Sequence, residues 1–231
     1  MPEPLPTVLL TRPQDAAQAF SEDLRRAGVQ ADVLIFPVVT IEHLKPEPDF
    51  NRYSGAIFTS ANGVTSVEGQ NLTAWCVGPS TAQAARNRGW RAISADGDAQ
   101  ALVRRILADV PEGPLLHVRG ERTRGDIAAQ LTQSGFPADE FIAYRQIFQP
   151  LSEQARELLS REKPVILPLF SPLSARQVAK EAPFRAPCLV AAISQAVADE
   201  SAPLNPEKLF VAAKPNAASM IEAVIRLMDA A

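Results

Sequence analysis

The segment 7–28 reads TVLLTRPQDAAQAFSEDLRRAG, and its pattern decides the fold. Residues 7–11 form a short, continuous apolar run, as in a strand that is covered on both faces. A helical pattern follows from about 14 to 27 and stops at Gly28, a residue type that commonly ends helices. A strand followed directly by a helix is the repeating unit of a parallel sheet covered by helices.

The same alternation continues along the rest of the chain. Further apolar runs predict strands at 31–36, 56–58, 74–77, 91–94, 115–118, 165–170, 188–193 and 209–212. Helices are predicted between them at 81–88, 99–108, 125–134, 152–161, 172–181, 195–200 and 217–230, with a barely two-turn helix at 63–69. We therefore predict an α/β fold of doubly wound, flavodoxin-like parallel sheets.

Two longer segments interrupt this alternation. Residues 36–44 (FPVVTIEHL) and 139–149 (DEFIAYRQIFQ) are rich in β-branched or aromatic residues and lead into polar, proline-containing stretches. We interpret them as two crossings between lobes that pair as an antiparallel ladder. One lobe then comprises 1–36 and 150–231 and the other 45–138, with 37–44 and 139–149 as linker strands. The alternative is that both segments are ordinary edge strands of a single sheet.

Composition limits the function classes. The 23 basic and 26 acidic residues give a net charge of −3, which argues against a surface for nucleic acid. No apolar stretch approaches the ~20 residues of a membrane span, and the N-terminus does not resemble a signal peptide. Cys76 and Cys188 lie in apolar runs and are interpreted as buried thiols. These features favour a cytoplasmic protein, with no stripe or run that suggests a dimer.

The predicted strand-to-helix junctions carry the functional signal, because ligands of open α/β sheets bind at the carboxyl ends of the strands. The junctions combine hydroxyls, small residues and cations: Thr11, Arg12, Thr59, Ser60, Asn62, Ser80, Thr81, Arg119, Arg122, Ser171, Ser174, Ser194 and Lys214. Several helix N-termini at one edge would hold a carboxylate or phosphate. Taken one at a time, the same residues are also ordinary helix caps.

Basic side chains at these junctions have a competing interpretation. Arg119, Arg122 and Arg124 belong to RGERTRGD, which also contains Glu121 and Asp126. That stretch therefore fits a solvated, salt-bridged helix start as well as an anion site. Arg145, on the second crossing, is a further candidate cation.

The junctions contain no histidine, cysteine or carboxylate pair for metal binding or acid–base catalysis. His43 lies in the first crossing, and His117 lies inside an apolar strand, as a packed core histidine would. Motifs for nucleotide binding and for serine hydrolases are absent from the sequence as well. We expect no cofactor and no metal, and an enzyme that works by positioning a reactive substrate.

Taken in order, the junction motifs resemble one family. VLLTRP, IFTSANGV, VGPSTAQAARNRG, LLHVRGERTRGDIAAQL, YRQ, LFSPLSARQV, AAISQAVA and VAAKPNAASMIEAV follow the order of motifs in uroporphyrinogen-III synthase. The resemblance spans nearly the whole chain. The ordered set is more specific than any of its members, of which TSANGV, VGPSTA and FSPLSA are the best.

The resemblance implies two α/β lobes, a two-stranded linker and a substrate held in the cleft between the lobes. It implies a cyclising hydro-lyase of porphyrin and heme (tetrapyrrole) biosynthesis that needs no cofactor. The substrate is hydroxymethylbilane, a linear tetrapyrrole with eight carboxylates, and the product is uroporphyrinogen III, with ring D inverted and water lost. We also predict a cytoplasmic monomer and a transient contact with the preceding pathway enzyme, although the sequence does not show the oligomeric state.

The implied chemistry accounts for the missing acid–base groups. Loss of the hydroxyl gives a reactive azafulvene, which attacks the substituted carbon of ring D and forms a spiro intermediate that recloses inverted. Tyr144 matches the family's linker tyrosine, and its hydroxyl would assist departure of the substrate hydroxyl, because a phenol stays protonated at neutral pH. The alternative is that Tyr144 is a linker aromatic residue that packs against a lobe.

The other junction residues are carried over as binding groups. Thr81, Ser171 and Ser194 match cleft hydroxyls, while Thr11, Arg12, Ser60 and Asn62 match the first two motifs. Only twelve residues separate Asn62 from Trp75, so the helix there must be abbreviated, which weakens the assignments of Asn62 and Gly63.

Two alternatives remain open. One is a non-catalytic, hinge-closing binding protein for an anionic solute, and the other is a degenerate synthase-like domain with a regulatory role. Product analysis with hydroxymethylbilane separates them from the synthase, because only the synthase forms the type III isomer.

Overall fold

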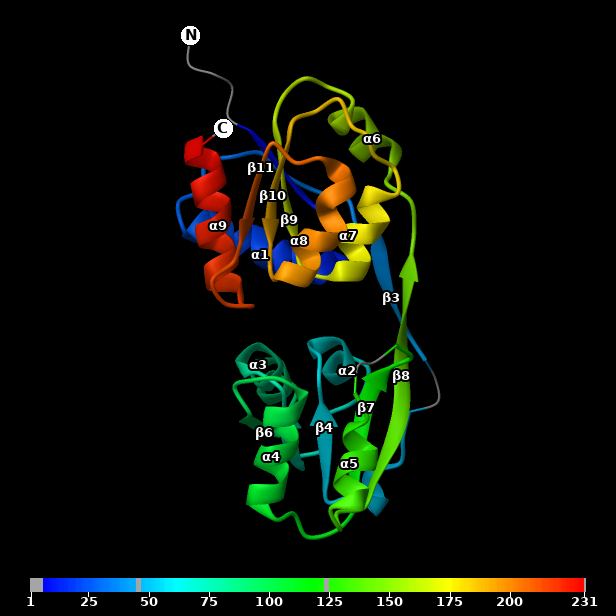
Figure 1. Ribbon diagram of the computed structural model, residues 1–231. Coiled ribbons are helices and arrows are strands. Elements are labelled where there is room, and N and C mark those ends of the chain that lie inside the picture. Colours follow the sequence, from blue (N-terminus) through cyan, green and yellow to red (C-terminus); the bar gives the residue numbers. More distant parts are fainter. Residues whose placement is uncertain (1–5, 45–46, 123–124, 231) are drawn as a thin grey trace. The chain divides into compact units, whose positions relative to one another are not determined.

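The computed structural model describes residues 6–44, 47–122 and 125–230, so Arg124 lies outside the described residues. The chain divides into two compact units, which we call unit 1 (1–40 with 147–231) and unit 2 (41–146). Each unit contains its own sheet of mainly parallel strands, covered by helices on both faces (Figure 1). The predicted doubly wound α/β class is therefore confirmed.

The sheet of unit 1 has five parallel strands in the order β11-β10-β9-β1-β2. Their bounds are Thr7–Leu10 (β1), Val33–Ile35 (β2), Val165–Leu169 (β9), Cys188–Ala192 (β10) and Lys208–Val211 (β11). Numbered along unit 1 alone, the order is that of flavodoxin, 2-1-3-4-5. The strand order therefore reverses between β1 and β9, which is where such sheets bind ligands.

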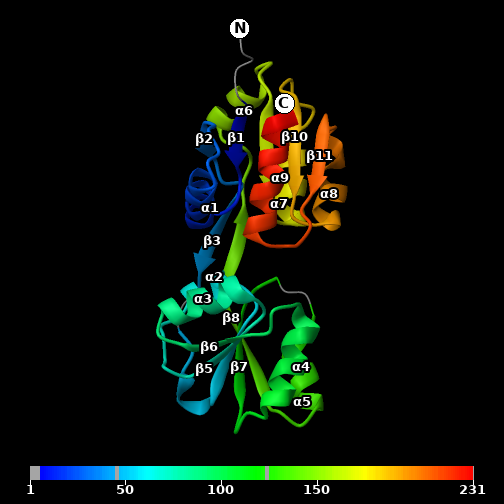
Figure 2. The ribbon, with the colours of Figure 1, turned by 90° about the vertical axis from the view of Figure 1, so that its left-hand side faces the viewer.

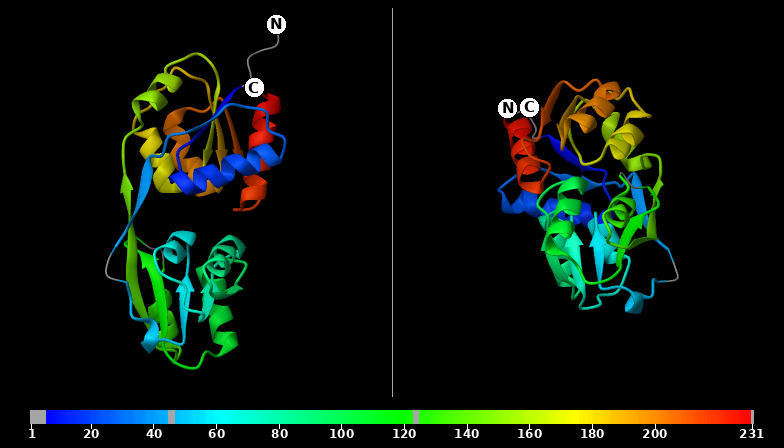
Figure 3. Two further views of the ribbon diagram at one scale, coloured as in Figure 1. Left: turned by 180° about the vertical axis from the view of Figure 1, so that it is seen from behind. Right: turned by 60° about the horizontal axis from the view of Figure 1, so that its bottom comes forward.

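Helices cover both faces of this sheet. They are α1 (Gln14–Arg26), α6 (Glu153–Leu159), α7 (Pro172–Ala179), α8 (Gln195–Ser201) and α9 (Ala217–Ala230), with a short 3₁₀ turn at Ala202–Leu204. Phe20 and Leu24 of α1 pack with Val224 and Leu227 of α9 on one face, whereas α6, α7 and α8 cover the other. Figure 3 (left) shows α1 and α9 on the near side of this sheet. Burial of these faces supplies the main stabilisation of unit 1.

The second sheet has six strands in the order β3-β8-β7-β4-β5-β6. Their bounds are Val39–His43 (β3), Gly55–Phe58 (β4), Thr73–Cys76 (β5), Arg91–Ser94 (β6), Leu115–Gly120 (β7) and Ala138–Phe148 (β8), and a 3₁₀ turn spans Phe50–Arg52. Strands β4 to β8 are parallel and follow the order 3-2-1-4-5, as in nucleotide-binding sheets. Unit 2 thus differs in strand order from the flavodoxin-like order of unit 1.

Two pairs of helices cover the sheet of unit 2. They are α2 (Ala61–Thr65) with α3 (Pro79–Asn87), and α4 (Ala99–Asp109) with α5 (Ile127–Gln133), the second pair lying together on one side in Figure 2. Trp90 packs edge-on against Phe50 and Phe58, each with ring centroids 5.2 Å apart, beneath the first pair. Leu102 and Leu131 belong to the core beneath the second pair.

The helix predicted at 63–69 begins earlier and is shorter, at Ala61–Thr65. The hydroxyl of Ser60 accepts the N–H of Asn62 at 3.1 Å, so Ser60 caps the helix. Gly63 lies inside the helix against β7, where a Cβ atom would be 2.8 Å from the carbonyl oxygen of Val118. The prediction was wrong because it treated this glycine as a helix start, whereas its small size permits close packing on the sheet.

The two crossing segments pair with each other as β3 and β8. The N–H of Leu44 donates to the carbonyl of Ala143 at 2.8 Å, and the N–H of Gln149 donates to the carbonyl of Val38 at 3.0 Å. Residue numbers in both pairs add to the same value, as in an antiparallel ladder. Strand β8 also pairs in parallel with β7 from Ala138 onward, which explains its length of 11 residues.

Cys76 and Cys188 are buried free thiols, as their apolar surroundings predict. Burial raises the pKa of Cys76 to about 12 and that of Cys188 to about 11, so neither is a reactive thiolate at neutral pH. Over 6–44, 47–122 and 125–230, no helix is long and apolar enough to span a membrane. The same residues contain no group of three or more His, Cys, Asp or Glu that could hold a metal ion.

Candidate active site

The junction residues predicted from the sequence gather at the carboxyl ends of the strands within each unit. In unit 1 they are Thr11 and Arg12 after β1, Ser171 and Ser174 after β9, Ser194 after β10 and Lys214 after β11. Val8 pairs with Ile166, and continuation of this register places Arg12 level with Phe170. The edge of this sheet thus carries hydroxyls and cations side by side.

The serines of unit 1 differ in how their hydroxyls are used. Ser171 caps α7, because its Oγ accepts the N–H of Ser174 at 3.1 Å and donates to the Ser174 hydroxyl at 2.9 Å. Ser194 has an extended backbone before α8, but its side chain makes no cap hydrogen bond. The capping interpretation therefore describes Ser171, while the hydroxyl of Ser194 is the better candidate for a ligand.

Arg12 has the most unusual environment at this edge. Its guanidinium carbon lies 3.9 Å from the centre of the Phe170 ring, in cation–π geometry. The Nε atom is buried and has no hydrogen-bond partner among the described residues. Burial lowers the pKa of Arg12 to about 10, opposed by the negative charge of Asp23, and the side chain stays charged at neutral pH.

Thr11 and Lys214 mark the two extremes of exposure. Thr11 is 2% exposed, and its carbonyl accepts the N–H of Val38 at 2.9 Å. Lys214 is exposed, and its carbonyl accepts the N–H of Asn216 at 2.8 Å just before α9. Thr11 is therefore closed to solvent within unit 1, whereas Lys214 presents a charge to solvent.

Unit 2 collects the remaining predicted residues at the corresponding edge. They are Thr59, Ser60 and Asn62 after β4, Ser80 and Thr81 in the first turn of α3, Arg119 and Arg122 around the end of β7, and Tyr144 in β8. Phe58 pairs with both Val118 and Cys76, so Ser60 lies level with Gly120 and Gly78 on the neighbouring strands. Thr81 is buried at 5% exposure, whereas Ser80 beside it is exposed.

Arg119 is occupied by partners within unit 2. Its terminal nitrogens donate to the carbonyl of Gly120 at 2.9 Å and to the carboxylate of Glu140 at 2.7 Å. A weaker bond of 3.3 Å reaches the carbonyl of Glu121. These hydrogen bonds fix Arg119 at the end of β7. Arg119 could contact a substrate only if some of them broke.

Tyr144 is aimed by an irregularity in β8. Arg119 pairs with Ile142 but Gly120 pairs with Tyr144, so Ala143 is an extra residue that forms a β-bulge. Tyr144 is 7% exposed, and its ring covers Gly120, where a Cβ atom would lie 2.8 Å from two ring carbons. The carbonyl of Tyr144 accepts the N–H of Glu121 at 2.8 Å. Backbone and ring are both held at the carboxyl edge of the sheet.

His117 is fully buried on β7, as predicted for a core histidine. Its Nδ1 lies 3.6 Å from the Glu140 carboxylate, which is beyond hydrogen-bonding distance. Burial lowers the pKa of His117 to about 4, an effect that Glu140 opposes and Arg119 reinforces. The ring is therefore neutral at physiological pH.

We expect His117 to make unit 2 sensitive to acid. The unfolded chain binds a proton at this residue below about pH 6.5, whereas the folded chain does so only near pH 4. The stability of unit 2 therefore carries no penalty from His117 above pH 6.5. Its free energy of unfolding falls by up to about 3 kcal/mol as the pH drops toward 4. Denaturant unfolding monitored by tryptophan fluorescence reports unit 2, because both tryptophans, Trp75 and Trp90, belong to it.

The variant for this measurement is His117→Leu, which should flatten the dependence of unfolding free energy between pH 7 and 5. An equal pH dependence in wild type and His117→Leu would contradict the assignment.

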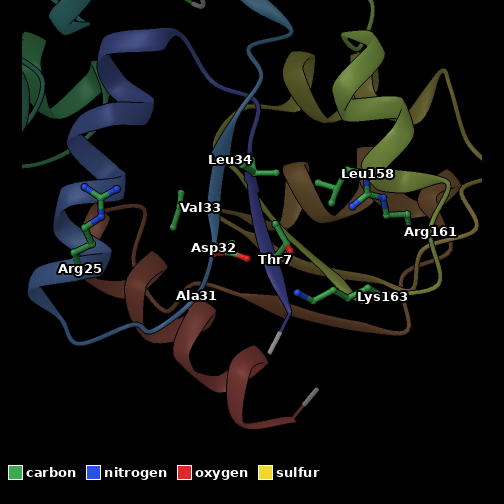
Figure 4. A pocket seen from close by; sticks show the side chains of 9 residues that line it. All are labelled: Thr7, Arg25, Ala31, Asp32, Val33, Leu34, Leu158, Arg161 and Lys163. Carbon is green, nitrogen blue, oxygen red and sulfur yellow. The ribbon is translucent and has the colours of Figure 1, made fainter. Parts of the chain in front are cut away.

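A cavity of about 400 Å³ in unit 1 lies elsewhere, at the amino end of the strands (Figure 4). Thr7 at the start of β1 and Asp32 before β2 line it, together with Arg25, Arg161 and Lys163. None of the predicted junction residues lines this cavity. The edge that carries the predicted junction residues and this cavity are therefore different places.

Two residues at the site were missed by sequence reasoning. Phe170 was assigned only to a strand, and Gly120 only to a loop, yet they contact Arg12 and Tyr144. A glycine or aromatic residue directly at the end of a predicted strand is a weak signal. Phe170 and Gly120 matter because of Arg12 and Tyr144, which lie far from them along the chain, so no local pattern points to either residue.

Fold and site together define a class: a two-unit α/β protein whose mainly parallel sheets carry hydroxyls, helix N-termini and a half-buried arginine at their carboxyl edges. The model of the family described as uroporphyrinogen-III synthase HemD matches residues 18–222. The chain belongs to the uroporphyrinogen-III synthase family, and the resemblance of its junction motifs is confirmed.

Individual relatives agree with this assignment. Uroporphyrinogen-III synthase of Chlorobaculum parvum is 26% identical over 192 residues, covering 74% of this chain and 76% of the relative. The crystal structure of the Helicobacter pylori 26695 uroporphyrinogen-III synthetase matches with a TM-score of 0.66 at 15% identity, over 96% and 100% of the two chains. A mutant uroporphyrinogen III synthase of the extremely thermophilic bacterium Thermus thermophilus matches with a TM-score of 0.51 at 13% identity, over 97% and 100%. The two structures show a shared fold.

Proposed function

We propose that this chain converts hydroxymethylbilane into uroporphyrinogen III, as a lyase that closes the macrocycle, inverts ring D and releases water. The observation that carries this function is the family match over residues 18–222. The arrangement of the junction residues at the carboxyl edges of both sheets supports it, because a polycarboxylate needs several anion-binding groups.

In the proposed mechanism, the hydroxyl of Tyr144 donates a hydrogen bond to the departing hydroxyl of the substrate. The hydroxyl leaves as water together with the proton of the pyrrole nitrogen, and an azafulvene remains. The substituted carbon of ring D then bonds to the electrophilic carbon of the azafulvene, which gives a spiro intermediate. This intermediate fragments and recloses with ring D inverted. The reactive substrate supplies its own electrophile, so the protein's main task is to position the two terminal rings.

The carboxylates of the substrate are assigned to the junctions. The binding groups are Thr11, Arg12, Ser171, Ser174, Ser194 and Lys214 from unit 1, and Thr59, Ser60, Asn62, Ser80, Thr81, Arg119 and Arg122 from unit 2. The side chains of Arg12 and Ser194 are the strongest of these candidates, because neither has a hydrogen-bond partner among the described residues. Ser60 and Ser171 act through the helix starts that they cap.

The decisive experiment is incubation with freshly generated hydroxymethylbilane, followed by separation of the isomers after oxidation. We expect uroporphyrinogen III as the main product. If only type I forms, at the rate of the protein-free control, the synthase assignment is wrong. The chain would then be a binding or regulatory protein for an anionic small molecule.

We further propose that the protein acts in the cytoplasm as a monomer and receives its substrate in a transient contact with the preceding enzyme. The two buried free thiols fit a reducing compartment. A reactive substrate that closes spontaneously favours such a handover.

A further inference from the structure

The pair formed by Arg12 and Phe170 is more specific than a general cation at the edge of a sheet. The guanidinium carbon lies over the face of the Phe170 ring, 3.9 Å from the ring centre. Phe170 itself is held edge-on by Phe20, with ring centroids 4.8 Å apart. Two aromatic rings thus support one arginine at the end of β1.

The hydrogen-bonding capacity of this arginine is left unused. The buried Nε atom has no partner, and no hydrogen bond or ion pair of Arg12 is present among the described residues. The nearest charge that influences it is that of Asp23, whose carboxylate is bonded by Arg26 instead. A buried N–H group without a partner is costly, so the Nε atom of Arg12 lowers the stability of the free protein.

The location of the pair agrees with a role in binding. Arg12 follows β1 and Phe170 follows β9, the two strands between which the order of the sheet reverses. Ligands of such sheets bind at this reversal point. A guanidinium stacked on a ring still presents its in-plane N–H groups, which match the two oxygens of a planar carboxylate.

We propose that Arg12 clamps one side-chain carboxylate of the substrate in a bidentate manner, and that Phe170 is the positioning residue that holds its guanidinium. This inference rests on the proposed function, because it names the group of the substrate that meets this point of unit 1. Phe170 acts through Arg12 and makes no hydrogen bond of its own to the ligand.

The test measures binding of uroporphyrin III, the stable oxidised form of the proposed product, by fluorescence quenching. We expect Arg12→Gln to raise Kd about ten- to a hundredfold, because a hydrogen-bonded charge pair is lost. Arg12→Lys should raise it at least about fivefold, because lysine keeps the charge but lacks the planar fork. Arg25→Gln is the matched control and should stay within about twofold, since Arg25 lies on α1 near the amino end of the sheet.

The role of Phe170 is tested by a double-mutant cycle. Phe170→Leu should raise Kd about three- to tenfold in the wild type and have almost no effect in the Arg12→Gln chain. A purely structural role through Phe20 would give the same effect in both backgrounds. The thermal midpoint supplies a second readout, because Arg12→Met should raise Tm by about 2–4 °C while it weakens binding.

The proposal is overturned if Arg12→Gln or Arg12→Lys binds uroporphyrin III as tightly as the wild type. The proposed function fails in a different experiment. A protein that forms no type III isomer but still loses affinity on Arg12→Gln would keep the carboxylate clamp and lose the synthase activity. If the protein forms type III and Arg12→Gln leaves Kd unchanged, the synthase activity stands and the carboxylate clamp is overturned.

Discussion

Replacing Tyr144 with phenylalanine should slow formation of uroporphyrinogen III by at least about tenfold and raise the fraction of type I product. The substitution removes one oxygen atom, and the ring that packs over Gly120 in the core of unit 2 remains. Unassisted closure of the substrate continues at its own rate, so slower enzymatic departure of the hydroxyl shifts the product toward the uninverted isomer. Initial rates and isomer ratios on freshly generated hydroxymethylbilane measure both effects.

The chain offers a matched control in Tyr53, its only other tyrosine. The Tyr53 hydroxyl donates to the carboxylate of Asp139 at 2.8 Å, near the start of β8 and away from the junctions. Tyr53→Phe should leave rate and isomer ratio unchanged, whereas the Tyr144 variant changes both. Unchanged turnover with an unchanged isomer ratio in Tyr144→Phe would remove this hydroxyl from the mechanism.

The local elements of the fold could be predicted because their signals lie within a few residues of each other. The helix that begins at Gln14 stops next to Gly28, whose φ of +83° suits the left-handed end of a helix. Continuous apolar runs predicted parallel strands for the same reason, since both faces of such strands are covered. The carboxyl edge of each sheet then followed from chain direction alone.

Strand order and pairing could not be predicted in this way. Nothing near β4 indicates that it pairs with β7 as well as β5, which produces the 3-2-1-4-5 order of unit 2. Arg119 donates to the carboxylate of Glu140 on the neighbouring strand, a contact that no local pattern predicted. Such contacts depend on tertiary packing, which overrides the local pattern of a sequence.

The bulge in β8 is the clearest case of a feature invisible to periodicity. Strict alternation from Phe141, which faces the core, would turn Tyr144 to the opposite side of the sheet. The extra residue Ala143 resets the alternation, so Tyr144 packs into the same core cluster. The family motif located the tyrosine, but only the structure explains how its ring is aimed.

Gly120→Ala should therefore impair catalysis although it touches no substrate in the proposed mechanism. The new Cβ atom would lie 2.8 Å from ring carbons of Tyr144 and 3.1 Å from its hydroxyl oxygen, closer than such atoms pack. Gly120 cannot retreat easily, because its carbonyl is held by Arg119 at 2.9 Å. The ring must move instead, and displacement of a catalytic group by about 1 Å can lower kcat by up to about a hundredfold. We expect a loss of about ten- to a hundredfold in kcat, with a smaller change in KM.

A double-mutant cycle distinguishes displacement of the ring from general damage to unit 2. In a Tyr144→Ala chain the ring is gone and the Cβ atom of residue 120 has room, so Gly120→Ala should lower activity no further. The penalty in unfolding free energy, followed by the fluorescence of Trp75 and Trp90, should shrink in the same background. Equal losses in both backgrounds would instead show that Gly120 is needed by the backbone of β7 itself. The bulge at Ala143 and Gly120 therefore act together. The bulge turns Tyr144 to the core face of the sheet, and Gly120 leaves space for its ring.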